Sequence, residues 1–145
     1  MPRQEFTFFH SLRVRWAEVD MQGIVFNGHY LLYFDVAFTE FWRATGLPSV
    51  VQQAADGIEL FARKSTIEYI APARFDDVLD IGVRCQAIGR SSLTISINIY
   101  CADQHLISGE LVYVYADAKA RKSVALPPIW RTVLTEFDGS TPALG

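Results

Sequence analysis

The chain has 145 residues, of which 50% are hydrophobic, 13% aromatic and 20% charged, with a formal net charge of −3. These values fit one folded domain and exclude a disordered chain. The longest apolar runs, such as 30–34, are far shorter than the roughly 20 residues that cross a membrane. With 13 basic against 16 acidic residues, no basic field is available for a nucleic acid. We therefore expect a small-molecule or protein partner, with no nucleic acid and no membrane.

The first predicted elements are a strand and a long helix. Residues 6–16 alternate apolar and polar side chains, which is typical of a half-buried strand. Residues 28–45 are predicted to be helical, with Asn27 as N-cap and Gly46 closing the C-terminal end. This segment is apolar on nearly every side, which predicts a helix buried on nearly every side.

Four further strands are predicted at 58–70, 79–87, 92–101 and 107–116, because apolar and polar residues alternate along them. The second and third of these form a hairpin, in which Ile88 is expected to face Ser92. This register separates Cys85 from Cys101 by roughly 20 Å, too far for a disulfide. Free thiols and an N-terminus without a secretory signal together favour a cytoplasmic location.

These elements predict an α+β fold, with a curved five-stranded antiparallel sheet wrapped around one long central helix. The domain is expected to span 1–137. A short helix begins near Pro127 and Pro128, and 138–145 is expected to be a disordered tail. Because one small sheet cannot cover a helix that is apolar all round, we expect a homo-oligomer.

Asp20 lies shortly before the predicted helix N-terminus. A helix start offers unpaired N–H groups and a partial positive charge. Such N–H groups can bind a carbonyl oxygen that becomes negative, while a nearby carboxylate attacks the carbonyl or activates water. Ile24, Val25 and Phe26 could line an apolar slot for an acyl group. The alternative is that Asp20 is an ordinary turn residue in a turn completed by Gly23. The spacing alone does not identify an enzyme.

Residues 19–26, followed by Tyr30, resemble the signature of the hotdog-fold acyl-CoA thioesterases of the 4-hydroxybenzoyl-CoA thioesterase type. The similarity continues through 67–79 and covers roughly 12–134. It implies a hotdog fold, hydrolysis of an acyl-CoA thioester without a cofactor, and assembly into dimers or tetramers.

The resemblance also implies roles for particular residues. Asp20 would be the nucleophile or the base for water, and the backbone N–H of Asn27 would polarise the thioester carbonyl. Phe26 would line the acyl slot, while Arg90 and Ser92 would bind CoA.

The sequence departs from the family in two places. Many relatives carry His where this chain has Asn27, and Asn where it has His29, so a proton-shuttling imidazole would have to be His29. Met21 and Gln22 replace smaller residues beside the acyl pocket. His29 is expected either to contact substrate or orient Asp20, or to be an interface histidine.

Two other functions stay open from the sequence. A non-catalytic acyl-CoA-binding hotdog protein is one alternative. A hotdog dehydratase or hydratase is the other, although it needs an acidic partner for His29 and the sequence shows no matching motif. His10 and His105 lie outside any metal-ligand spacing, so we expect no metal.

Overall fold

The computed structural model describes residues 2–139 and 143–144. Its helical elements are α-helices and short 3-10 helices: η1 (Arg3–Glu5), η2 (Trp16–Glu18), α1 (His29–Thr45), α2 (Val50–Ala55) and α3 (Pro128–Asp138). Its strands are β1 (Phe8–Arg13), β2 (Ile58–Tyr69), β3 (Val78–Ile88), β4 (Ser92–Cys101), β5 (Gln104–Asp117), β6 (Lys122–Ser123) and β7 (Ala143–Leu144). No helix of the described ranges is long and apolar enough to span a bilayer.

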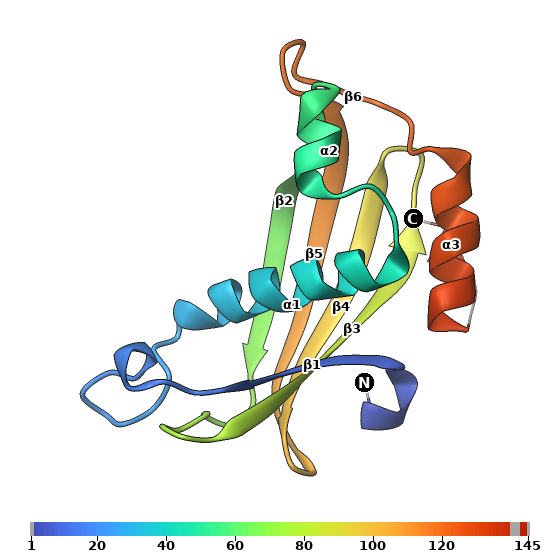
Figure 1. Cartoon of the computed structure of the whole chain (residues 1–145). Helices are drawn as coiled ribbons and strands as arrows, with labels where there is room; N and C mark the ends of the chain where they lie inside the picture. The colour runs from blue at the N-terminus through green and yellow to red at the C-terminus, as the bar shows by residue number, and fades with distance from the viewer. Residues whose placement is uncertain (1, 140–142, 145) are drawn as a thin grey trace.

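The main sheet is antiparallel, in the order β1-β3-β4-β5-β2, with β6 added beside β5 and β7 beside β3. The five long strands confirm the sheet predicted for the α+β fold. The sheet curls, so that β1 passes along one side of α1 while β2 and β5 lie behind the helix (Figure 1). This curl places the start of α1 and the end of β2 at the same end of the molecule.

Helix α1 is 17 residues long and begins one residue later than predicted. Gly28 is the N-cap and no side chain caps the helix, so Asn27 lies in the loop before it. Gly46 ends the helix in the left-handed conformation, with φ of 77°, as the sequence predicted. The ring of Phe34 lies against Gly109 of β5, where a Cβ would overlap the ring. The helix therefore approaches the sheet closely.

Within one chain, the expectation of a helix buried on nearly every side is wrong. Its sheet-facing residues are buried, but Leu32 is 56% exposed, and Leu31 and Val36 are also exposed. The sheet covers one side of the helix, and the apolar residues on the other side lie at the surface of the chain. Asp35 and Glu40 also lie on this other side, but the apolar residues beside them hid this signal in the sequence.

The bounds of β1 and β5 and the register of the β3–β4 hairpin differ from those expected. β1 is shorter because the chain turns into η2 at Trp16. β5 begins at Gln104, directly after a turn that holds Ala102 at φ of 51°. In the hairpin, Ile88 pairs with Leu93 rather than Ser92, and an irregularity between Cys85 and Ala87 restores the expected register further along. Both cysteines are free thiols, as predicted.

Helix α3 confirms the predicted C-terminal helix. It begins at Pro128 with proline in the first turn, where a missing N–H costs nothing. It extends to Asp138, whose Oδ2 accepts a hydrogen bond from the Cys85 N–H at 3.0 Å. The predicted boundary between the domain (1–137) and the tail (138–145) therefore falls inside this helix. Of the expected tail, 140–142 and 145 lie outside the described residues.

Candidate active site

The loop between η2 and α1 is built around a tight turn. The N–H of Asp20 donates to Ile24 at 2.9 Å, and the N–H of Gly23 donates to the Asp20 carbonyl at 3.0 Å. Gly23 has φ of 78°, a conformation that favours glycine. The Asp20 carboxylate accepts the Gln22 N–H at 2.8 Å through Oδ1. Asp20 is thus the first residue of the predicted turn, and Oδ2 has no partner in the described part of the chain.

Backbone contacts fix this loop against the segment that precedes β3. The N–H of Val25 donates to Ala73 at 2.9 Å, and Ile24 forms an isolated bridge with Arg74. The N–H of Ala73 in turn donates to the Tyr30 hydroxyl at 3.1 Å, in the first turn of α1. Burial raises the pKa of that hydroxyl, so Tyr30 stays neutral. The loop and the start of the helix are held as one unit.

Asp20 and Asn27 lie on the same cavity, whose volume is about 410 Å³. The wall is mostly apolar and comes from the loop, the first turn of α1 and the end of β2. Its residues are Asp20, Gln22, Ile24, Val25, Asn27, Tyr30, Tyr69, Ile70, Ala71 and Pro72. The volume falls within the range of small-molecule sites.

The peptides on both sides of Asn27 are held by hydrogen bonds. The Phe26 carbonyl, which shares a peptide with the Asn27 N–H, accepts the His29 N–H at 2.8 Å. The hydroxyl of Tyr69 donates to the Asn27 carbonyl at 3.2 Å. Among the residues that the structure describes, no acceptor lies within reach of the Asn27 N–H. An unpaired N–H at the positive end of a helix is suited to bind an oxygen that carries negative charge. The cavity therefore combines a carboxylate with a candidate oxyanion site.

Glu18 is a residue of this region that sequence reasoning missed. Its side chain is 4% exposed, and it accepts hydrogen bonds from Arg15 and from the Tyr33 hydroxyl. His29 Nε2 lies 3.2 Å from Glu18 Oε2. The expectation that His29 lacks an acidic partner is therefore wrong. The four-residue spacing of His29 and Tyr33, one turn of a helix, was the signal available in the sequence.

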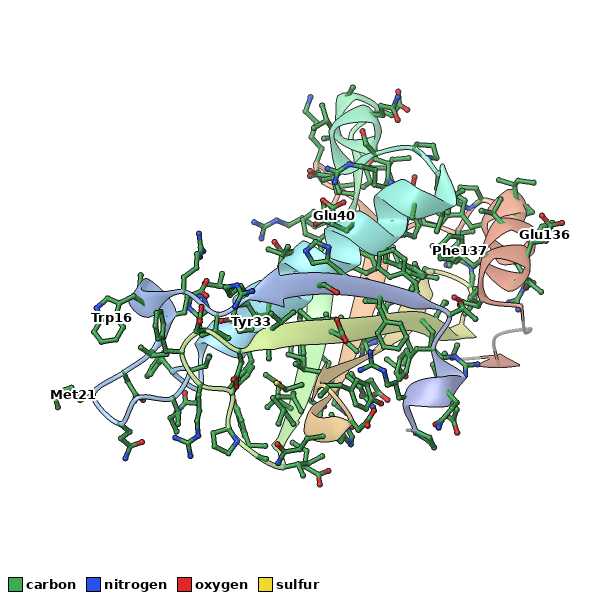
Figure 2. All side chains as sticks on the ribbon, turned by 60° about the horizontal axis from the view of Figure 1, so that its bottom comes forward. Trp16, Met21, Tyr33, Glu40, Glu136 and Phe137 are labelled. Atoms are coloured by element: carbon green, nitrogen blue, oxygen red, sulfur yellow. The ribbon has the colours of Figure 1, made fainter. Side chains whose placement is uncertain are left out.

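The other predicted residues do not line this cavity. His29 faces Glu18 rather than Asp20, and Phe26 is 54% exposed and packs against Gly28. Met21 points into solvent at the loop tip (Figure 2). Arg90 and Ser92 lie at the β3–β4 turn, at the opposite end of the molecule from the loop before α1 (Figure 1). Within one chain, the structure brings together Asp20 and Asn27 alone of the six predicted residues.

In the ranges covered by the structure, no group of three His, Cys, Asp or Glu side chains could hold a metal ion.

A curled antiparallel sheet that wraps around one helix is the hotdog fold. The chain belongs to the thioesterase superfamily, whose sequence pattern matches residues 22–108.

Two relatives illustrate this membership. The acyl-CoA thioester hydrolase YbgC of Escherichia coli is 32% identical over 133 residues, which cover 90% of this chain and 95% of the relative. The acyl-CoA thioesterase YbgC of Helicobacter pylori is 20% identical over 132 residues, covering 85% of this chain and 96% of the relative.

Solved structures share the fold. A protein from Aquifex aeolicus superposes with a TM-score of 0.80 and 28% identity, over 88% of this chain and 98% of that one. A 1,4-dihydroxy-2-naphthoyl-CoA thioesterase from Synechocystis superposes with a TM-score of 0.83 and 22% identity, over 90% of this chain and 97% of that one.

Proposed function

We propose that the protein hydrolyses an acyl-CoA thioester, with Asp20 as nucleophile or as base for water and the Asn27 N–H as oxyanion donor. The observation that carries this proposal is that both groups line one cavity in a member of the thioesterase superfamily. The similarity to the acyl-CoA thioester hydrolase of Escherichia coli supports the substrate class.

The two groups divide the chemistry between them. As nucleophile, Asp20 attacks the thioester carbonyl, the C–S bond breaks, and the CoA thiolate leaves and takes up a proton. Water then hydrolyses the acyl-aspartyl anhydride and regenerates the carboxylate. As base, Asp20 removes a proton from the attacking water and the leaving thiolate receives it. Both routes place negative charge on the carbonyl oxygen, which the Asn27 N–H and the positive helix end stabilise.

The cavity wall suits an apolar acyl group. Val25, Tyr30 and Ile70 supply apolar surface. The cavity volume of about 410 Å³ is large enough for an acyl group but not for a whole acyl-CoA molecule. The nucleotide end of CoA must then extend beyond the cavity. Arg90 could pair with a phosphate and Ser92 could donate to a ribose or phosphate oxygen. These two residues lie at the opposite end of the molecule from the cavity, so a CoA site that uses them requires the β3–β4 turn of a second copy.

We infer that the protein works as a homo-oligomer, a dimer or a tetramer. The exposed apolar face of α1, formed by Leu31, Leu32 and Val36, supports this inference. β2 ends the strand order of the sheet, so its outer side is available to a further strand. Sedimentation velocity at micromolar concentration tests the assembly, and a homogeneous monomer would contradict it.

The free thiols of Cys85 and Cys101 favour a cytoplasmic location. Cell fractionation tests this inference, and recovery of the protein outside the cytoplasm would contradict it.

Asp20→Asn tests the mechanism. We expect kcat to fall by about 10²- to 10⁴-fold, because the amide neither attacks nor accepts a proton, while binding of free CoA is retained. The control is Asp103→Asn, an exposed aspartate in the β4–β5 turn, which should keep the activity of the original protein. Turnover is measured as thiol release from short alkyl, long alkyl and aromatic CoA thioesters. Substantial turnover by Asp20→Asn would refute the role of Asp20. CoA binding by the unaltered protein without turnover of any thioester would favour a binding protein.

A further inference from the structure

Glu18 is a buried carboxylate, two residues before Asp20, to which the mechanism above gives no role. It lies in η2, between β1 and the loop that carries Asp20, and only 4% of the residue is exposed. Burial of an ionised carboxylate is costly unless hydrogen bonds replace its water. The hydrogen-bond partners of Glu18 therefore indicate which parts of the structure it holds together.

The two carboxylate oxygens receive partners from two different segments. Oε1 accepts the Arg15 backbone N–H at 2.7 Å and the Tyr33 hydroxyl at 2.9 Å. Oε2 accepts the Arg15 guanidinium at 2.8 and 3.1 Å and lies 3.2 Å from His29 Nε2. Arg15 precedes the loop, whereas His29 and Tyr33 belong to α1, which follows it. The Glu18 carboxylate thus joins the chain on both sides of the loop. We call Glu18 and its partners Arg15, His29 and Tyr33 the junction.

This junction lies next to both reacting groups along the chain. Asp20 is two residues after Glu18, and Asn27 is two residues before His29. The Glu18 carbonyl also accepts the Phe26 N–H at 3.1 Å, which closes the base of the loop. In Figure 2, Tyr33 lies between the start of α1 and the chain that leads from β1. These contacts add to those of Val25 and Tyr30 with Ala73 in holding the loop against the start of α1.

The junction requires a negative charge. Burial alone would raise the pKa of Glu18, but hydrogen bonds from the Arg15 side chain and backbone and from Tyr33 lower it to about 2. Burial, together with the bond to Glu18, raises the pKa of the Tyr33 hydroxyl, which remains a donor. A glutamine would turn an NH₂ group toward donors of Arg15 or Tyr33, so the junction would open even though the side-chain shape is kept.

We propose that Glu18 is a positioning residue, which fixes the Asp20 carboxylate relative to the Asn27 N–H and so sets the rate of the chemical step without touching the substrate. This role rests on the proposed function of Asp20. Because the rate of an attack depends steeply on geometry, a displacement of about 1 Å can cost about 10²-fold in rate.

The test compares Glu18→Gln with Asp80→Asn as a matched control. The Asp80 carboxylate also accepts two short bonds, from Arg3 and Ser11 at 2.6 Å each, but it lies in β3, away from the cavity residues. We expect Glu18→Gln to lower kcat by about 10- to 100-fold with KM changed less than about threefold. Asp80→Asn should retain kcat, and Glu18→Asp, which restores the charge, should recover part of the loss.

Two further variants separate positioning from folding. Tyr33→Phe removes one hydroxyl from the junction and should lower kcat by about 3- to 10-fold. If Glu18→Gln does not fold, the kcat of Tyr33→Phe decides whether the junction positions Asp20. In an Asp20→Asn background, Glu18→Gln should change the residual rate by less than about twofold, because Glu18 acts through Asp20.

Three outcomes would overturn the assignment. If Glu18→Gln keeps kcat within about threefold while Asp20→Asn is inactive, Glu18 does not position the reacting groups and the proposed function stands. If the two losses simply multiply in the double variant, Glu18 acts independently of Asp20. If Asp20→Asn itself keeps kcat, the proposed function fails, and the role of Glu18 fails with it.

Discussion

Replacing Glu18 with glutamine should remove a part of the folding stability that depends on pH. The ordinary pKa of 4.5 falls to about 2 in the folded protein, because hydrogen bonds from Arg15 and Tyr33 outweigh the opposing effect of burial. The unfolded chain therefore binds the proton more tightly than the folded one. This stabilisation is fully present above pH 4.5 and is lost as the pH falls toward 2.

The magnitude follows from the two pKa values. At about 1.4 kcal/mol for each tenfold change in proton affinity, the stabilisation has an upper value of about 3 kcal/mol. The Arg15 side chain is 79% exposed, so solvent screens its charge and weakens its share. We therefore expect the wild type to exceed Glu18→Gln in free energy of unfolding by about 2 kcal/mol near pH 6. Most of this difference should be lost by about pH 2.5.

Urea unfolding followed by tryptophan fluorescence, at several pH values between 6 and 2.5, measures this difference. Glu40→Gln is the control, since Glu40 pairs with Arg43 on the exposed side of α1 and should contribute little at any pH. A difference between wild type and Glu18→Gln that stays constant from pH 6 to pH 2.5 would refute the reasoning.

Three other perturbations have defined outcomes. Gly109→Ala should destabilise the fold by about 1–3 kcal/mol, because its Cβ would overlap the Phe34 ring; an unchanged thermal unfolding midpoint would contradict this close packing. Burial raises the pKa of the Cys85 thiol to about 12, so a thiol reagent at pH 8 should modify Cys101 first in the folded protein, and equal rates would count against it. Leu32→Asp should lower the mass seen by sedimentation, since a charge weakens an apolar contact; an unaltered mass would exclude this face from the interface.

The sheet could be predicted from the sequence because its apolar residues repeat with a period of two, although in β4 the residues between them are buried as well. Ile95, Ile97 and Ile99 in β4 are all fully buried, as their alternation indicates. The irregularity between Cys85 and Ala87 could not be predicted, because it depends on how β3 fits β4.

Helix α2 was missed although the sequence held a signal for it. The Ser49 hydroxyl accepts the Gln52 N–H, and the Gln52 side chain accepts the Ser49 N–H, which is a capping box. The helix has only six residues, too few for an apolar period to be visible.

The part of the candidate site whose residues lie close together in the sequence could be predicted. Asp20 and Asn27 lie within one loop before a helix start, and the resemblance to the thioesterases, rather than this spacing alone, predicted a role for both. Tyr69 and Ile70 complete the cavity from the end of β2, and only the curl of the sheet brings them there. Glu18 was missed because its importance arises from partners on a different element.

The loop that carries Asp20 is fixed at its base, whereas its tip at Met21 is fully exposed (Figure 2). An inserted residue at this tip would break the hydrogen bonds from Gln22 and Gly23 that hold Asp20. The Met21 side chain itself can be exchanged without displacing the carboxylate. A reporter group carried at this point would sit beside the cavity without filling it.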